Sequence, residues 1–248
     1  MVEEAAMTMR LVSTHYSHEL QRSPGGAAHR SSQRRESLRI PTHRLAYRVV
    51  KSAMDLFLAT TIFPFAFVLG LGIAVLVKIS SPGPVFFRHR RIGTGLRPFL
   101  LWKFRTMFHE SDHSLSLHLA SNPDAHQEWA RHQKLRRDPR VTPIGRLLRR
   151  THLDELPQLL NVLAGEMSLV GPRPVIEEEL KRYGAGDRLY AAAKPGMTGL
   201  WQVSGRASLP YERRVALDVE YVATWSVLGD FRVLMRTFGA ICDARGVY

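Results

Sequence analysis

Cysteine is nearly absent from this chain, since Cys242 is the only one in 248 residues. A single cysteine cannot form an internal disulfide, and it cannot build a zinc site from cysteine ligands. Such cysteine usage is typical of a reducing compartment. The length suits one or two domains with a sizeable core.

Acidic residues are also scarce relative to basic ones. Asp and Glu together number 22 against 35 Lys and Arg, which gives a formal net charge of +13. A positive balance of this size describes partners rather than fold. It indicates nucleic acid, an anionic membrane surface or phosphorylated substrates.

The first 43 residues have few apolar runs. They are rich in Ser, Arg, Gly and His, as in the stretch RSPGGAAHRSSQRRES. This composition predicts a disordered basic tail over residues 1–43. A cleaved targeting peptide is the weaker alternative, because no apolar signal core follows a charged start.

Charge is missing altogether from one long segment. Residues 56–77 read LFLATTIFPFAFVLGLGIAVLV, without one charged side chain. As a helix this segment would be about 33 Å long, and a bilayer core is about 30 Å thick. Both flanks are basic, which favours the cytoplasmic side for both ends, and Pro64 supplies a helix break. We therefore predict a re-entrant helical hairpin over residues 44–80, with a single transmembrane span as the alternative.

Residues 81–248 are expected to form one cytoplasmic domain of the α+β class. The short apolar runs PVFFRH and PFLLWKF flank a Gly-Thr-Gly stretch, which predicts a small β-hairpin. One helix is expected to begin near Thr151 and to end at Gly165, and LPYERRVALDVEYVATW predicts another. A last helix carries an apolar stripe that suits a membrane surface, with core packing as the alternative. The stripe consists of Leu228, Phe231, Met235, Phe238 and Cys242.

Two adjacent carboxylates stand out in this basic chain. The stretch HLDELPQLLNVLAGEMSLVGPRP, residues 152–174, places Asp154 beside Glu155. In one interpretation the pair only stabilises a helix start, with Thr151 as the cap. In the other, an acid pair in a basic cluster marks the place where a divalent cation meets a phosphate.

Basic residues in three places favour the chemical interpretation. A cluster of three arginines lies just upstream of the acid pair. Arg173 lies between two prolines that restrict φ on both sides. A lysine and an arginine lie in the glycine-rich stretch KPGMTGLWQVSGR. A rigidly aimed guanidinium suits bidentate phosphate recognition. The other basic residues are Arg146, Arg149, Arg150, Lys194 and Arg206.

Together these residues predict phosphoryl transfer. One carboxylate would act as the nucleophile, as in the aspartyl-phosphate class of enzymes. Its neighbour would hold Mg²⁺, which binds one or two carboxylates together with substrate phosphates. The arginines would neutralise the charge of the transition state.

The chain resembles the bacterial sugar transferases, also called monotopic phosphoglycosyl transferases. Five blocks carry the resemblance, in the family's order, across residues 44–248. They are SPGPVFFRHRRIG, WKFRTM, DPRVTPIGRLLRRTHLDELPQLLNVLAGEMSLVGPRP, KPGMTGLWQVSGR and LDVEYV.

This resemblance implies a membrane enzyme. Members of the family move a sugar-1-phosphate from a UDP-sugar to polyprenyl phosphate and release UMP, at the start of exopolysaccharide or other glycoconjugate assembly. The family's nucleophile falls on Asp154 and its Mg²⁺ ligand on Glu155. Its arginine of the Gly-Pro-Arg-Pro motif falls on Arg173, and Arg149 matches a phosphate contact. Arg206 and Asp218 match later motif positions.

The resemblance also implies a monotopic fold with interfacial helices on the cytoplasmic face of the inner membrane. The family bends its membrane helix at a Ser-Pro pair, whereas this chain has Phe63-Pro64 about one turn earlier, and Thr60 or Thr61 would replace the serine hydroxyl. The chain looks like the minimal catalytic form, and a homo-oligomer is compatible with it.

Two other classes of function remain as alternatives. Net charge alone also suits a nucleic-acid-binding protein, but the apolar segment and the absence of interleaved aromatics in the tail argue against nucleic acid as a partner. A membrane-anchored scaffold without chemistry is the second alternative. The sequence does not identify the sugar.

Overall fold

The computed structural model describes residues 45–242, apart from residues 110, 133–134, 136 and 206–208. The predicted tail and Arg206 therefore lie outside the described residues.

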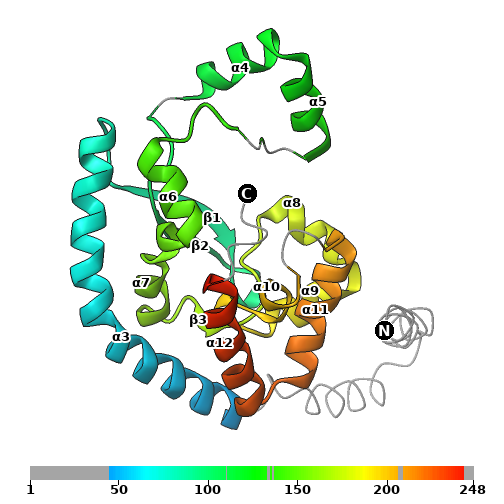
Figure 1. Cartoon of the computed structure of the whole chain (residues 1–248). Helices are drawn as coiled ribbons and strands as arrows, with labels where there is room; N and C mark the ends of the chain where they lie inside the picture. The colour runs from blue at the N-terminus through cyan, green and yellow to red at the C-terminus, as the bar shows by residue number, and fades with distance from the viewer. Residues whose placement is uncertain (1–44, 110, 133–134, 136, 206–208, 243–248) are drawn as a thin grey trace.

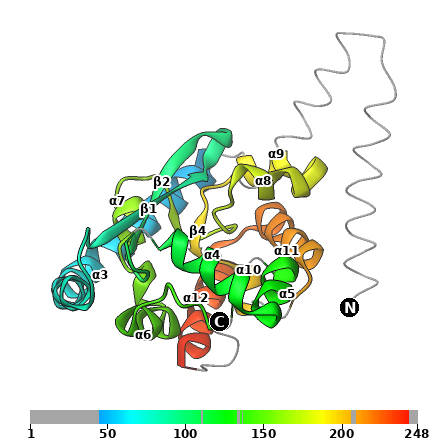
Figure 2. The ribbon, with the colours of Figure 1, turned by 90° about the horizontal axis from the view of Figure 1, so that it is seen from above.

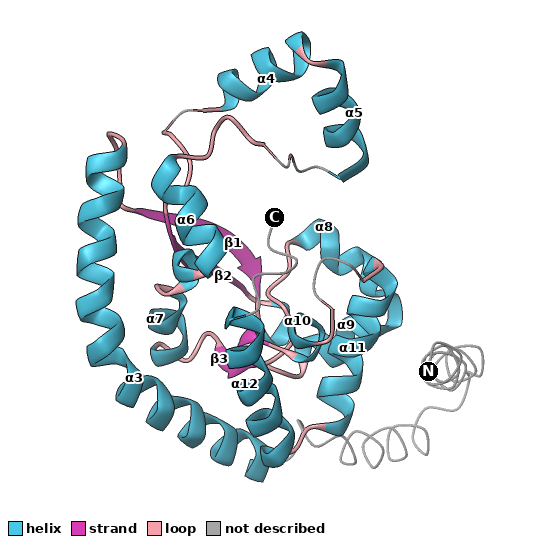
Figure 3. Cartoon of the chain, in the orientation of Figure 1, coloured by secondary structure: helices cyan, strands magenta, loops and turns pink. Residues whose placement is uncertain are grey.

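Helices dominate the described part of the chain, with two small sheets between them (Figures 1 and 3), which agrees with the α+β prediction. The longer helices are α3 (Leu45–Ser80), α4 (Asp112–Ser121), α5 (Pro123–His132), α6 (Pro143–Thr151), α11 (Tyr211–Thr224) and α12 (Val227–Cys242). The shorter ones are α7 (Gln158–Leu163), α8 (Glu177–Leu180), α9 (Asp187–Ala191) and α10 (Leu200–Val203). The described residues also contain the 3₁₀ segments η2 (Thr94–Leu96), η3 (Leu153–Glu155) and η4 (Lys181–Gly186).

The predicted β-hairpin is confirmed. Strands β1 (Phe86–Ile92) and β2 (Pro98–Phe104) pair antiparallel, with Phe86 opposite Phe104. The second sheet pairs β3 (Ser168–Val170) with β4 (Gly196–Thr198) in parallel. The two sheets deliver residues far apart in sequence to one region of the molecule.

The apolar segment forms α3, a single continuous helix with Pro64 inside it. Figure 1 shows that α3 bends along its length but does not fold back on itself. The predicted hairpin is therefore not confirmed. Thr60 and Thr61 donate to carbonyls one turn earlier, those of Leu56 and Phe57. The threonine hydroxyls are thus satisfied within the helix, but they do not bond to the Thr60 carbonyl that Pro64 leaves without a donor.

Most of α3 is exposed. Among the described residues it is the one helix long and apolar enough to cross a membrane, with a mean hydropathy of 2.4 in its most apolar window. Only 17% of that window is buried, whereas a core helix of a soluble protein is mostly buried. Phe65 and Val68 expose 79% and 70% of their surface, which suits contact with lipid rather than with protein.

Helix α12 has the predicted amphipathic character, and the core-packing alternative is wrong. The side chains of its apolar stripe are exposed, because the opposite face of the helix packs on the domain. Leu228, Phe231, Met235 and Phe238 are between 56% and 68% exposed. Buried Asp230 and Val233 lie on the face that contacts the core.

The helix predicted from Thr151 to Gly165 is interrupted, which corrects the expectation. Helix α6 ends at Thr151, whose hydroxyl donates back to the carbonyl of Leu147. His152 follows in the left-handed region, at φ 58° and ψ 12°. Thr151 therefore caps nothing downstream, and the interpretation of the acid pair as part of a capping box is wrong.

The domain core lies between α3, α7, α11 and the β3–β4 sheet. It includes Leu159, Met167, Val170, Tyr221 and Val222, all less than 8% exposed. Helix α6 approaches the end of β2 so closely that a Cβ on Gly145 would lie 2.0 Å from the Thr106 carbonyl oxygen. Only glycine fits there, and this close contact packs the first turn of α6 against Thr106, just beyond the end of β2. In Figure 1 α4 and α5 lie apart from this core, at the top of the view, and Figure 2 looks down on the molecule from their side.

Candidate active site

The acid pair lies in the 3₁₀ turn η3, between α6 and α7. The left-handed residue His152 ends α6 and reverses the chain, so that Asp154 faces the protein interior. A non-glycine residue in this conformation is uncommon, and such strain gathers at functional sites. The turn, rather than a helix start, aims the two carboxylates.

Glu155 forms an ion pair with strand β2. The Nζ of Lys103 lies 2.5 Å from its Oε1, and the two side chains are 24% and 32% exposed. Burial alone would raise the pKa of Glu155, but the charge and hydrogen bond of Lys103 outweigh it, and Arg173 adds to them. The pKa of Glu155 is therefore lowered, and this carboxylate is ionised at neutral pH.

Asp154 is more deeply buried, at 8% exposure. Burial raises the pKa of Asp154 to about 6, and the Glu155 charge adds to the rise, while Lys103 and Arg149 oppose it. At neutral pH the carboxylate is still mostly ionised but poorly solvated. Two adjacent carboxylates with pKa values pushed apart suit two different roles.

Arg149 comes to the pair from the last turn of α6. Its Nε donates to the Thr106 hydroxyl at 2.9 Å, just beyond the end of β2. Burial lowers the pKa of this guanidinium, and the neighbouring charge of Asp154 partly restores it. Arg149 therefore lies within electrostatic reach of the more buried carboxylate.

Arg173 comes to the other side, from the loop after β3. Its backbone N–H donates to Oδ2 of Asp218 at 3.3 Å, and Tyr183 donates to the same oxygen at 2.8 Å. Burial raises the pKa of Asp218 to about 7. Asp218 is 2% exposed, and its hydrogen bond with the Arg173 N–H holds the backbone of the Gly-Pro-Arg-Pro loop.

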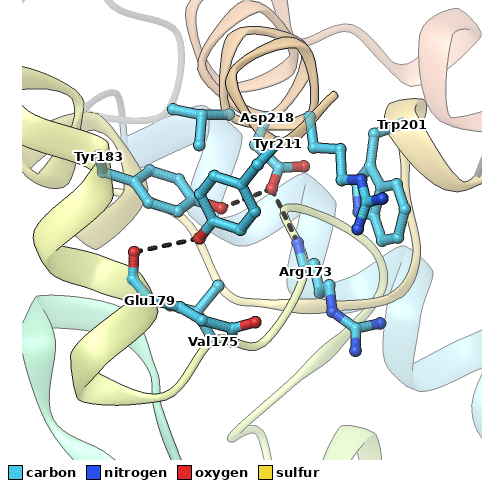
Figure 4. A pocket seen from close by; sticks show the side chains of 9 residues that line it. Arg173, Val175, Glu179, Tyr183, Trp201, Tyr211 and Asp218 are labelled. Carbon is cyan, nitrogen blue, oxygen red and sulfur yellow. Dashed lines mark hydrogen bonds between the residues drawn. The ribbon is translucent and has the colours of Figure 1, made fainter. Parts of the chain in front are cut away.

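A pocket opens beside Arg173 (Figure 4). The guanidinium carbons of Arg173 and Arg214 lie 5.5 and 5.2 Å from the centre of the Trp201 ring. Burial and the charge of Arg173 lower the pKa of Arg214. Two guanidinium groups around one ring make this pocket electropositive, which suits an anionic ligand. Its remaining walls are Val175, Glu179, Tyr183, Tyr211, Val215 and Asp218.

Comparison with known proteins identifies the family of the chain. A family model described as bacterial sugar transferase matches residues 46–244, about four fifths of the chain. The chain belongs to the bacterial sugar transferase family. As a member, it is an enzyme of the phosphoglycosyl transferase class.

Several curated relatives of the sugar transferase have informative names. The exopolysaccharide production protein ExoY of Rhizobium meliloti is 46% identical over 200 residues, which cover 81% of this chain and 88% of that protein. The UDP-glucose:undecaprenyl-phosphate glucose-1-phosphate transferase of Caulobacter vibrioides is 38% identical over 216 residues, 84% and 75% of the two chains. The undecaprenyl-phosphate galactose phosphotransferase of Salmonella typhimurium is 47% identical over 166 residues, 67% of this chain and 35% of that protein.

The structure brings four of the predicted site residues of this sugar transferase into one electrostatic environment. Arg149 acts on Asp154, and Arg173 acts on Glu155. Lys194 lies elsewhere, with its Nζ 3.4 Å from the Ser52 hydroxyl of α3. The predicted role of Arg206 stays a prediction.

Sequence reasoning missed several residues of the site. Lys103, Thr106, Trp201 and Arg214 were within quoted motifs or next to them, but no spacing linked them to the acid pair. The alternation along β2 was the available signal, since it puts Trp102 and Lys103 on opposite faces of the hairpin. Which face meets η3 depends on packing.

The donor groups at the acid pair decide whether Mg²⁺ can bind there. Among the described residues, no group of three or more His, Cys, Asp or Glu side chains is placed to hold a metal. Mg²⁺ usually takes one or two carboxylates and completes its shell with water and substrate phosphates. Glu155 is ionised, and a carboxylate that accepts from Lys103 retains further lone pairs. The residues present therefore fit the ion only together with a phosphate substrate.

Asp154 should destabilise the folded protein at neutral pH. The pKa of Asp154 in the folded state lies above its ordinary value. The folded state therefore loses stability as pH rises from about 4 to about 6, and this loss persists at higher pH. We expect Asp154→Asn to raise the free energy of unfolding at pH 7.5, by at most about 3 kcal/mol. At pH 4 the gain should fall below about 1 kcal/mol. Thermal unfolding in detergent at both pH values measures this, and an equal gain at both would contradict it.

Proposed function

We propose that this enzyme transfers a sugar-1-phosphate from a UDP-sugar to undecaprenyl phosphate and releases UMP. The observation that carries the proposal is the buried Asp154 beside an ionised Glu155, with cationic side chains around both. The names of the relatives support the two substrates, and ExoY supports a role in exopolysaccharide initiation.

In the first half-reaction a carboxylate oxygen of Asp154 attacks the β-phosphorus of the UDP-sugar. A bond forms between that oxygen and the phosphorus, and the bond from phosphorus to the bridging oxygen breaks. UMP leaves with the electron pair, and a phosphosugar remains on Asp154. Covalent catalysis of this kind splits one difficult displacement into two.

In the second half-reaction a phosphate oxygen of the polyprenyl phosphate attacks the same phosphorus. The bond to Asp154 breaks, the carboxylate is regenerated, and a polyprenyl diphosphosugar is the product. Arg149 and Arg173 would stabilise the phosphoryl charge in both steps. Arg214, which also lies near the Trp201 ring, would bind the diphosphate.

Glu155 would hold Mg²⁺, with Lys103 keeping its carboxylate ionised and oriented. When bound, the ion neutralises the charge of the diphosphate. Glu155 itself takes no proton and forms no covalent bond in this scheme. Its lowered pKa keeps it available as a ligand throughout the neutral range.

The apolar surfaces of α3 and α12 would place the enzyme on the cytoplasmic face of the inner membrane. The beginnings of these helices lie side by side (Figure 1), joined by an ion pair between Lys51 and Asp230. The stripe of α12 carries exposed apolar side chains beside Arg232 and Arg236, an arrangement that suits the headgroup region.

The test of the function is UMP release by the purified enzyme in nanodiscs. A panel of UDP-sugars is offered with undecaprenyl phosphate and Mg²⁺, and one sugar is expected to give rapid release. Omission of the lipid should leave a single burst of UMP, about one per enzyme. No release with any UDP-sugar would refute the proposal.

Both ends of α3 are expected to face the cytoplasm. The basic flanks favour this, and a bent helix can enter and leave through the same leaflet. In a Cys242→Ser background, Leu45→Cys and Arg90→Cys should both resist a membrane-impermeant thiol reagent in intact cells. Labelling of one position only would establish a full span.

A further inference from the structure

A buried ionic cluster joins the membrane helix to the domain. The Nζ of Lys51 lies 3.2 Å from Oδ1 of Asp55 and 2.8 Å from Oδ2 of Asp230. The three side chains are 4%, 4% and 0% exposed. Burying one cation and two carboxylates costs free energy of desolvation, which can exceed the attraction between the charges. The cluster is therefore not expected to add much to the stability of the fold. A role in positioning is the better explanation.

The cluster reaches beyond the two helices to strand β3. Oδ1 of Asp55 accepts the backbone N–H of Leu169 at 3.1 Å. The Tyr221 hydroxyl lies 2.8 Å from Oδ1 of Asp230 and 2.9 Å from the carbonyl oxygen of Val170. Strand β3 is thus held directly by the Asp55 carboxylate, and the Tyr221 hydroxyl, which has one proton to donate, lies between Asp230 and Val170.

Strand β3 leads directly to Arg173. The loop begins at Gly171, whose N–H donates to the Thr198 carbonyl at 2.9 Å. The next residues are Pro172, Arg173 and Pro174, and each proline has a fixed φ. A stiff connection of this kind transmits a shift of the strand to the guanidinium instead of absorbing it.

We propose that Asp55, a residue of the membrane helix, positions Arg173 through β3. Lys51 and Asp230 hold its carboxylate in place. The packing of α3 on the domain and the orientation of the Arg173 side chain are therefore linked. The inference rests on the proposed function, in which Arg173 binds the substrate phosphate.

Asp55 is the residue of the cluster best suited to a test. Its removal leaves Lys51 paired with Asp230, whereas removal of Lys51 would leave two carboxylates buried without a cation. In Asp55→Leu the Leu169 amide loses its acceptor. Asp55→Asn retains an acceptor oxygen, and Asp55→Glu retains the charge but displaces the carboxylate by one methylene. Thr61→Val, at an exposed position of the same helix, is the control.

The enzyme is tested as the full chain in nanodiscs, with UDP-sugar and undecaprenyl phosphate. We expect Asp55→Leu and Asp55→Glu to lower kcat/KM by about 10-fold or more, since a displacement of 1 Å can cost about 100-fold. Asp55→Asn and Thr61→Val should stay within about 3-fold of the parent. A loss in Asp55→Asn as large as in Asp55→Leu would overturn the role of the Leu169 hydrogen bond, as would full activity of both Asp55→Leu and Asp55→Glu.

Hydrogen exchange and a double variant separate positioning from general damage. The Leu169 amide should exchange faster in Asp55→Leu and Asp55→Glu but not in Thr61→Val. In an Arg173→Ala background, Asp55→Glu should lower the residual activity by less than about 2-fold, because the group that it positions is gone. Equal losses in both backgrounds would overturn the inference. Normal activity of Arg173→Ala alone would instead refute the phosphate-binding role on which it rests.

Discussion

Asp154→Asn is expected to abolish turnover, by at least about 1000-fold. An amide cannot replace the carboxylate as a nucleophile, and asparagine has nearly the same size, so the buried turn should keep its shape. The measurement is UMP release from the UDP-sugar without acceptor, followed by mass spectrometry of the protein. The parent should carry a phosphosugar adduct on Asp154, and the variant should carry none.

The control for this result is Asp124→Asn, which neutralises an exposed carboxylate on α5 and should retain full turnover. An adduct that maps to Glu155 would reverse the two assignments. UMP release that requires both substrates at once would exclude a covalent intermediate. The stability change predicted for Asp154→Asn makes a folding defect recognisable, because the inactive variant should unfold at a higher temperature at pH 7.5 than the parent.

Arg173→Lys is expected to lower kcat by about 10-fold or more, as for removal of one transition-state donor. Lysine keeps the positive charge but loses the planar fork that binds phosphate through two parallel hydrogen bonds. It also loses the flat face that lies near Trp201, where the guanidinium carbon is 5.5 Å from the ring centre. Steady-state kinetics with both substrates saturating measures the change.

Arg188→Lys on α9 is the matched control, since that arginine is exposed and lies outside the residues that line the pocket. It should leave kcat unchanged. Activity of Arg173→Lys close to that of the parent would mean that the Gly-Pro-Arg-Pro stretch is only a rigid turn. A loss confined to KM would mean that Arg173 binds the ground state and the transition state equally.

The interruption between α6 and α7 shows where local sequence reasoning reaches its limit. The helix start predicted near Thr151 is wrong, because α6 ends at that residue. The predicted end at Gly165 agrees with the structure, since Gly165 takes a positive φ of 77° just after α7. Between them the chain adopts a left-handed residue and a 3₁₀ turn, which no propensity of His152 predicts. Tertiary contacts override local preference here, because the turn buries Asp154 against β2 and α6.

The side chains that contact the acid pair and Arg149 also could not be predicted from the sequence. Lys103 is 52 residues away from Glu155 in sequence, and Thr106 is 43 residues from Arg149. Lys103 lies in β2 and Thr106 just beyond its end, and α7 packs on the strand that meets η3. Asn161 does this with its side-chain amide, which accepts from the Trp102 N–H and donates to the Leu100 carbonyl.

The sequence by itself determined what depends on neighbours along the chain. An uncharged run of 22 residues is long enough for a bilayer, two apolar runs around Gly-Thr-Gly pair as a hairpin, and an Asp-Glu pair with nearby arginines indicates phosphoryl transfer. Only the tertiary structure decided which carboxylate is buried, which lysine holds the other, and that Lys51 and Asp55 of α3 meet Asp230 of α12. These are contacts between distant segments, and their energies arise from burial and charge pairing that no local window contains.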